Sequence, residues 1–552
     1  MALPGLVVVD LPAPGLHEPA GVLVGQLRGH LGGSLISVTC YRDDPTVGRS
    51  SGKGSRATGR DTGRGRPDRL PPGLATLPRA ASPLSWYRTR RRLSAVRSGV
   101  GIGLESMGRK TARRHAQGEE SRRRILEATL AIAARRGYDG TTVAQVTEAT
   151  GLPASSIYWH FGSKDELLAD VLEHSFQQRT AMPIWSVGPG DEPRREQLEN
   201  RLRQAITSLA TQPEYWRLGL MLALERRPRE PAARRRFLQL RAEAEHHIGG
   251  WWRQMLGPER PPSDVDVPLL MAQFTLAGLD GLFVAWQSDP DLGAADRLAR
   301  VLAHGLDAIA DRLLGGARPR SEVPAPAPAQ EEAAGSGRDR ILLSAAAVAA
   351  ERGYDGATIS RICARARLPA SSLYWFYRDK DDLLAAVVEH SYQEWQSRQP
   401  GWKPVPPGAT WQGALRSRLT SSIESLAASP NFLRIGHMLA LERRETPPSG
   451  RDLFLQVRRH ARGLSGDWFA DVLAADLPAR GPDLPALLSQ LLMAFTDGLF
   501  LAHQMGTPEW DADLAGAMLV VLLEEAVHDH PSPSTTSSSH GTREPNTGIA
   551  PA

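Results

Sequence analysis

Two short runs of alanine, serine and aromatic residues stand out as candidates for contact with nucleic acid. Serine hydroxyls can bond base edges or phosphates, and an alanine methyl can meet a thymine methyl. A tyrosine adds an aromatic body and a phenol that can reach a phosphate oxygen. The first run contributes the candidates Ala154, Ser155, Ser156, Tyr158, Trp159 and His160, and the second contributes Ala370, Ser371, Ser372, Tyr374 and Trp375.

A lysine follows each run closely. Ser163 and Glu166 have the spacing of a capping box, which would place Lys164 at a helix N-terminus, a favourable position for an anion. A lone lysine is more often a solvated side chain, and its position at the cap is what favours phosphate. We interpret Lys164 as a phosphate contact and Lys380 as its counterpart. Thr142 and Thr358 complete the set of DNA-contact candidates.

The residues before the first run predict a helix-turn-helix. Thr142 begins a short helix, and Gln145 three residues later completes a capping box. That helix ends at Gly151, and the next one begins at Pro153, where a fixed φ and a missing N–H are tolerated. Two short helices joined by a tight glycine turn can place the second one in a major groove.

A longer helix precedes this pair in each half of the chain. Its apolar residues fall at helical spacing, and Gly137 and Gly353 are placed where a left-handed C-terminal cap would end it. The spaced positions are Ile125, Leu126, Thr129, Leu130 and Ala133 in one half, and Ile341, Leu342, Ala345, Ala346 and Ala349 in the other. We find no alternating strand pattern in either half, so the predicted fold class is all-α.

The two halves are copies of one another. Gly137–Gly140 recurs 216 positions later as Gly353–Gly356, and Leu152–Ser156 recurs as Leu368–Ser372. Farther on, Met221–Arg227 recurs 217 positions later. One inserted residue across so long a stretch indicates two copies of the same fold, which we call repeat one and repeat two.

Charge does not by itself indicate DNA binding. The chain has a formal net charge of +5, but residues 1–106 alone contribute +8, so the remainder is slightly acidic.

Cys40 and Cys363 are the two cysteines, too few for a disulfide framework or a cysteine-rich zinc site, and they fit a reducing cytoplasm. No long apolar run or secretory signal is evident, so we expect no membrane association. No nucleophile–base pair, phosphate loop or metal-spaced set stands out, so no enzyme activity, catalytic residue, cofactor or metal is predicted.

The residues of the first module resemble the DNA-binding domain of TetR-family transcription regulators. The resemblance rests on Thr141–Val143, the Gly151 turn, Ile157–Gly162 and Ser163–Leu168, and repeat two shows it at Thr358–Ile359, Leu373–Trp375 and Asp379–Leu384. It implies two tandem units, each a three-helix DNA-binding domain followed by a helical body that binds an effector and dimerises. It also implies that effector binding changes the separation of the two recognition helices.

The resemblance indicates which aromatic residues are expected to face DNA. A stripe of aromatics at helical spacing is more often core than a recognition surface. Ile157 and Phe161, one turn apart, are interpreted as core, whereas Tyr158 and Trp159 match the family's DNA-facing positions.

Repeat two departs from the pattern at its turn. Arg367 replaces the turn glycine and would pay a steric cost if it must adopt a positive φ. Phe376 and Tyr377 stand in place of His160 and Phe161. The second module therefore either binds DNA with altered geometry or has lost DNA binding, and the sequence leaves both open.

We divide the chain into eight segments. Residues 1–106 are rich in Gly, Pro, Ser and Arg, and are either a basic disordered arm or a stretch upstream of a true start at Met107. The remaining segments are a basic arm (107–118), helix-turn-helix domain one (119–178), regulatory body one (179–314), a Pro/Ala/Gly linker (315–337), helix-turn-helix domain two (338–394), regulatory body two (395–529) and a disordered tail (530–552).

The bodies suggest how the repeats pair. Pro268–Gln287 and Leu484–Met505 are strongly apolar, and each precedes another helix. By resemblance these helices form a four-helix dimer interface, so we expect the two repeats to form an internal pseudo-dimer, with or without further homodimerisation. Its expected partners are a double-stranded DNA operator, an imperfect palindrome, and a small-molecule effector of unknown identity.

The effector-binding residues stay unknown at this point. Large aromatic and apolar residues of repeat one could line a pocket or form the core equally well: Trp185, Trp216, Leu220, Trp251, Trp252 and Phe274. The main hypothesis is an effector-responsive repressor in the cytoplasm. The alternative is a ligand-binding or interaction protein in which one or both DNA-binding modules are degenerate.

Overall fold

The computed structural model describes most of the chain after residue 103. The described residues are 26–31, 34–39, 104–180, 184–185, 188, 190–257, 265–288, 295–315, 336–397, 399, 401–427, 430–444, 446–506 and 511–529. The predicted linker and tail therefore lie largely outside them. The chain divides into two compact units, Met1–Gly99 and Val100–Ala552.

The first unit contains a β-hairpin that the sequence pattern did not predict. Strands β1 (Gln26–Leu31) and β2 (Ser34–Thr39) pair antiparallel, with Leu31 opposite Ser34. The sequence has glycine at both intervening positions, and a glycine pair favours a two-residue hairpin connection. Two six-residue strands are too short to stand out by period alone.

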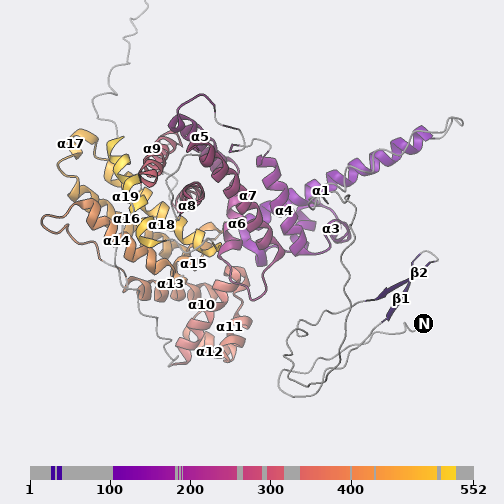
Figure 1. Cartoon of the computed structure of the whole chain (residues 1–552). Helices are drawn as coiled ribbons and strands as arrows, with labels where there is room; N and C mark the ends of the chain where they lie inside the picture. The colour runs from indigo at the N-terminus through magenta and orange to yellow at the C-terminus, as the bar shows by residue number, and fades with distance from the viewer. Residues whose placement is uncertain are drawn as a thin grey trace, which may run out of the picture. The chain divides into compact units, whose positions relative to one another are not determined.

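The described residues of the second unit are helical, as predicted, and the same order of helices occurs twice (Figure 1). Repeat one comprises α1 (Leu104–Gly140), α2 (Val143–Thr150), α3 (Ala154–Phe161), α4 (Lys164–Thr180), α5 (Arg194–Thr211), α6 (Pro213–Leu224), α7 (Ala232–Met255), α8 (Val267–Ser288) and α9 (Ala295–Leu314). Repeat two comprises α10 (Gly337–Gly356), α11 (Ile359–Ala366), α12 (Ala370–Phe376), α13 (Lys380–Gln396), α14 (Trp411–Ala427), α15 (Asn431–Leu441), α16 (Ser449–Val472), the short α17 (Leu477–Arg480), α18 (Leu484–Gln504) and α19 (Ala512–His528). Helix α1 includes the backbone of the predicted basic arm, whose side chains at Arg109, Lys110, Arg113 and Arg114 lie outside the described part.

The first helix of each repeat breaks at the predicted glycine. Gly137 has φ 68° and ψ −170°, and Gly353 has φ 68° and ψ −174°. The positive φ is as expected, but ψ is extended rather than left-handed α, so the chain turns and resumes one more helical turn. The Thr141 hydroxyl donates to the Gly137 carbonyl at 2.8 Å and so satisfies one acceptor that the break releases.

Helices α8 and α18 pack against each other at two glycines. A Cβ added at Gly281 would lie 1.6 Å from the Ala494 carbonyl oxygen, and one at Gly498 would lie 1.8 Å from that of Ala277. Only glycine permits the two backbones to approach so closely. Both helices are long and apolar enough to cross a membrane, but 89% and 78% of their apolar windows are buried inside the protein, as in core helices of a soluble protein.

Two further contacts between the repeats join a small residue to a large one. A Cβ at Gly278 in α8 would lie 2.6 Å from the ring of Phe495 in α18, and one at Gly305 in α9 would lie 2.8 Å from Leu522 in α19. The repeat offset of 217 makes Gly278 the equivalent of Phe495, and Gly305 the equivalent of Leu522. Phe495 and Leu522 thus fill space that would not be free if Gly278 and Gly305 were also large residues.

The loops after α6 and α15 also cross between the repeats. The Arg226 N–H donates to the Ala350 carbonyl at 3.0 Å, and the Arg443 N–H donates to the Arg135 carbonyl at 2.9 Å. Ala350 and Arg135 belong to α10 and α1, the first helices of the DNA-binding modules. The end of each body helix is therefore bonded to the module of the other repeat.

Candidate DNA-binding interface

The turn of the first module has the predicted caps. The Gln145 N–H donates to the Thr142 hydroxyl at 3.3 Å, and the Thr142 N–H donates to the Gln145 side chain at 2.8 Å. Gly151 is left-handed, with φ 68° and ψ 10°, and its N–H donates to the Thr147 carbonyl. Pro153 is the N-cap rather than the first helical residue, so α3 begins at Ala154.

The recognition helix α3 divides as expected into a buried and an exposed side. Ile157 and Phe161 are buried and join α3 to the core of the module. Tyr158 is 52% exposed and Trp159 79% exposed, whereas most large apolar side chains of the chain are buried. Large aromatics left in water are unfavourable unless a partner covers them, so this side is the candidate DNA-facing surface. Of the other candidates, Ala154 and Ser155 are exposed, and Ser156 and His160 are half-buried.

The second recognition helix presents the same surface. Tyr374 is 55% exposed, Trp375 84% exposed and Phe376 42% exposed, while Leu373 and Tyr377 are buried beneath them. Ala370 and Ser371 are exposed and Ser372 is half-buried, matching their counterparts in α3. Phe376 extends the aromatic surface at the position where repeat one has His160.

Arg367 adopts the strained conformation that its position demands. Its φ of 53° and ψ of 44° are left-handed, like those of Gly151, although its side chain makes that region costly. The Leu368 N–H donates to the Cys363 carbonyl at 3.1 Å across the turn. Cys363 itself is buried as a small residue, as expected. The turn of repeat two therefore keeps its backbone geometry without glycine.

The two lysines turn into the modules in this structure. The Lys164 ammonium donates to the carbonyls of Tyr138 at 2.9 Å and Thr141 at 3.1 Å, and lies 4.4 Å from the centre of the Tyr138 ring. Lys380 donates to the Tyr354 carbonyl at 3.1 Å and lies 3.9 Å from that ring. Burial lowers the pKa of both ammonium groups. A phosphate contact would have to use the remaining N–H or replace these bonds.

The remaining cap residues are largely engaged in the modules. The Glu166 N–H donates to the Ser163 hydroxyl at 3.2 Å, which is one of the two bonds of the predicted second capping box. The Ser163 N–H donates to the Phe161 carbonyl instead. Thr142 is exposed beside its cap bonds, and the hydroxyl of half-buried Thr358 accepts from the Arg361 N–H at 3.4 Å.

A junction between module and body recurs in both repeats. The Arg227 guanidinium lies 4.4 Å from the Tyr138 ring centre and bonds Glu225 at 2.6 Å. Arg444 lies 4.3 Å from the Tyr354 ring centre and bonds Glu442 at 2.7 Å. The repeated Glu-Arg-Arg sequence was the available signal for this cluster.

The two glutamates of these junctions are fully buried. Burial raises the pKa of Glu225 to about 7, although the charge of Arg227 opposes the shift. Burial raises the pKa of Glu442 to about 7 in the same way, opposed by Arg444. A Cβ at Gly353 would lie 3.6 Å from a Glu225 oxygen and 3.8 Å from a Glu442 oxygen, so both carboxyl groups flank the same break in α10. Both glutamates, one from each repeat, are therefore adjacent to the first helix of the second module.

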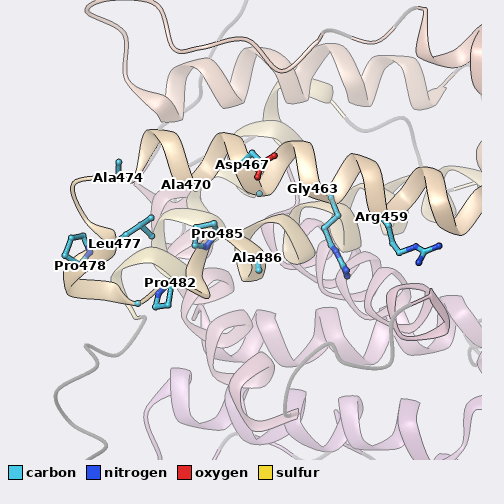
Figure 2. Close-up of a pocket in the computed structure, with 13 residues that line it drawn as sticks. Arg459, Gly463, Asp467, Ala470, Ala474, Leu477, Pro478, Pro482, Pro485 and Ala486 are labelled. Atoms are coloured by element: carbon cyan, nitrogen blue, oxygen red, sulfur yellow. The ribbon is translucent and has the colours of Figure 1, made fainter.

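The aromatic residues weighed as pocket candidates in repeat one are mainly core. Trp251, Trp252, Leu220 and Phe274 are at most 1% exposed, and Trp185 and Trp216 pack against the core. A hollow of about 790 Å³ lies on repeat two between α16 and the start of α18, around α17 (Figure 2). Its lining is mostly glycine, alanine and proline, which offer little chemistry for recognition. A smaller cavity of about 330 Å³ lies among α13–α16 and α18.

This geometry defines a class: two helix-turn-helix modules, each with an exposed recognition helix, in one chain. Residues 125–171 and 341–387 both match the family model of the bacterial regulatory proteins of the tetR family. The chain therefore carries the helix-turn-helix domain of this family twice, in tandem.

Two transcription regulators are similar to part of the chain. The HTH-type transcriptional regulator SrpR of Pseudomonas putida is 39% identical over 66 residues, which is 12% of this chain and 30% of that protein. The HTH-type transcriptional repressor NicS of Pseudomonas putida is 36% identical over 76 residues, 13% of this chain and 36% of that protein. The chain thus spans about a third of the length of these relatives.

Two solved structures match about a third of this chain. A transcriptional regulator from Rhodococcus sp. Rha1 matches with 20% identity and a TM-score of 0.27 over 35% of this chain and 97% of that one. AibR, solved in complex with isovaleryl coenzyme A and operator DNA, matches with 18% identity and a TM-score of 0.26 over 36% of this chain and 97% of that one.

Proposed function

We propose that the chain is an effector-responsive transcription repressor that binds operator DNA as an internal pseudo-dimer. The observation that carries the proposal is the matched pair of exposed surfaces on α3 and α12. Each presents two serines and a Tyr-Trp pair at equivalent positions. Such side chains suit contacts to base edges and phosphates in a major groove.

The operator is proposed to be an imperfect palindrome. Two recognition helices related by a pseudo-twofold axis read half-sites of opposite orientation. The shared Pro-Ala-Ser-Ser-x-Tyr-Trp segment makes the half-sites similar, and the His160-to-Phe376 and Gly151-to-Arg367 differences make them unequal. Lys164 and Lys380 are proposed to reach phosphate by exchanging or supplementing their present carbonyl bonds.

Effector control is proposed to act through the junctions after α6 and α15. Arg227 binds the module of its own repeat, whereas the neighbouring Arg226 N–H binds α10 of the other repeat. A displacement of α6 would therefore be transmitted to both modules together. Because both recognition helices belong to one chain, DNA binding would need no assembly of subunits. The activity is proposed to take place in the cytoplasm.

Selection of bound sequences from a random DNA pool tests the proposal. The expected result is a site with two recognisable, unequal half-sites in inverted orientation. A site with one recognisable half would exclude the pseudo-dimer. Native mass spectrometry of the selected complex should then show one chain per site.

The inward position of Lys164 and Lys380 favours one alternative, a ligand-binding or interaction protein whose modules no longer bind DNA. A mobility shift on the DNA that flanks the protein's own gene separates the two functions. Absence of any shift, together with an empty selection, would favour the alternative.

A further inference from the structure

The smaller cavity of repeat two has the size of a small-molecule site. Its volume of about 330 Å³ falls within the range of ligand pockets, roughly 300–1,000 Å³. Aromatic and aliphatic side chains form much of the wall, including Tyr392, Trp395, Phe432 and Leu433. Trp395 stacks on Phe432 with ring centres 5.6 Å apart, and its indole N–H has no hydrogen-bond partner among the described residues. The wall therefore suits an apolar body.

One cation at this cavity lacks an acidic partner. Arg418 lies 3.6 Å from the Trp402 ring centre and donates to the Gly401 carbonyl. No ion pair joins it to a carboxylate of the described residues, and burial lowers its pKa to about 10. A partly buried guanidinium without a counter-ion is unfavourable, so an anion bound beside it would be stabilised.

The acidic residue in the lining of this cavity, Asp497, is already neutralised. Asp497 accepts from Arg458 at 2.8 Å and contacts His437 at 3.0 Å. Burial alone would raise the pKa of Asp497, but these two partners lower it to about 2. Asp497 therefore remains an ionised carboxylate balanced by Arg458, and Arg418 stays uncompensated. The cavity favours negative over positive ligands.

Repeat one has larger side chains at the corresponding positions. Trp216 stands in place of Leu433, and apolar Ile248 and Leu279 stand in place of the hydroxyl residues Ser465 and Thr496. Ile248 and Leu279 are buried in the core. The Arg418 counterpart, Arg201, is only 8% exposed and donates to the carbonyls of Ile184 and Gly188.

We infer that repeat two binds one small amphipathic anion per chain, an apolar body with a carboxylate or sulfonate held by Arg418, and that repeat one binds none. Ser422 lines the same cavity and offers a hydroxyl, whereas the Thr496 hydroxyl donates to the carbonyls of its own helix. The binding claim stands on this cavity alone. That the anion controls DNA affinity rests on the proposed function.

A matched pair of fluorescent probes tests the inference with the full chain. 1-Anilinonaphthalene-8-sulfonate carries the anion, and N-phenyl-1-naphthylamine has the same ring system without it. The sulfonate should bind with one site per chain. The R418Q variant should weaken it about tenfold and leave the neutral probe within about twofold, because a charged hydrogen bond is lost.

Three further variants separate the charge of Arg418 from the shape of the cavity and from the fold. R418K keeps the positive charge and should retain most of the preference for the sulfonate, and circular dichroism checks that both Arg418 variants are folded. L433W, which introduces the residue of repeat one, should abolish binding of both probes. The matched R201Q variant in repeat one should leave both affinities unchanged.

The outcomes distinguish this inference from the proposed function. Two equal sulfonate sites, equal loss of both probes in R418Q, or sensitivity to R201Q would overturn the inference while DNA binding stands. Sulfonate binding at Arg418 by a chain that binds no DNA would support the inference and remove the proposed function. Sulfonate binding that leaves operator affinity unchanged would remove only its role as effector.

Discussion

The two turns of this molecule reach the same backbone conformation with different residues. Gly151 and Arg367 are both left-handed, yet glycine adopts that region freely and arginine does not. The aromatic surfaces beyond the turns are nevertheless alike, with Trp159 79% and Trp375 84% exposed. The comparison teaches that the surrounding module, rather than the turn residue, fixes the recognition helix.

Removing the exposed aromatics would test whether both surfaces bind DNA. We expect Y158A/W159A and Y374A/W375A each to lower operator affinity about 100-fold, because each deletes the main contacts of one half-site. Fluorescence anisotropy at fixed salt measures the effect. The exposed Leu269 in the body provides a control, since L269A should bind normally. Full affinity in Y374A/W375A would confine DNA binding to repeat one.

Glu225 and Glu442 test a feature that the two repeats share, a buried carboxyl group with a raised pKa. Their folded-state pKa of about 7 exceeds the ordinary 4.5, so the folded protein holds extra protons between these values. Stability should therefore fall as pH rises from 5 to 8, by about 2 kcal/mol for each glutamate. Urea unfolding across this range measures the slope. The E225Q/E442Q variant should remove most of it, and each single variant about half. A stability that rises over this range in the wild type would contradict the assignment.

Salt dependence would show whether the inward lysines turn toward DNA in the complex. If Lys164 and Lys380 each neutralise one phosphate, K164Q and K380Q should each reduce the slope of log affinity against log salt by about 0.9. Titrations between low and moderate salt measure this slope. Lys164 has two carbonyl bonds to give up and Lys380 one. An unchanged slope in both variants would mean that the two ammonium groups contact no phosphate and only stabilise the modules.

The turns themselves should give the smallest effect. R367G should raise the free energy of unfolding by about 1 kcal/mol, because it relieves a left-handed non-glycine residue. The reciprocal G151R should lower it by a similar amount. Denaturant midpoints measure both changes. A lower free energy of unfolding in R367G would mean that the arginine side chain stabilises the module by more than its left-handed backbone destabilises it.

Short-range features of the modules were predictable from sequence. The Thr142–Gln145 box, the Gly151 turn and the burial of Ile157 depend on residues three or four positions apart, where helical geometry dictates the neighbours. The exposure of Trp159 required the family resemblance as well, because periodicity alone favours core for an aromatic stripe.

Features that depend on distant chain segments were not predictable. Lys164 turns inward to the carbonyls of Tyr138 and Thr141, which lie more than 20 positions earlier in the sequence, just after the break at Gly137. The bond from Arg226 to Ala350 joins different repeats, and no local pattern signals it. The cavity beside Arg418 likewise depends on which body side chains face one another.

The glycine–phenylalanine contact between α8 and α18 affects which repeats could pack against each other if two copies of this chain associated. On a twofold axis a residue faces its own equivalent, and here the equivalents are Gly278 and Phe495. Pairing repeat one with repeat one would leave a void, and pairing repeat two with repeat two would set two phenylalanines in one space. Gly305 and Leu522 are a second small–large pair of equivalent residues, so pairing of like repeats would again leave a void or crowd two large side chains. The volumes of these side chains therefore favour packing of repeat one against repeat two over packing of either repeat against its own copy.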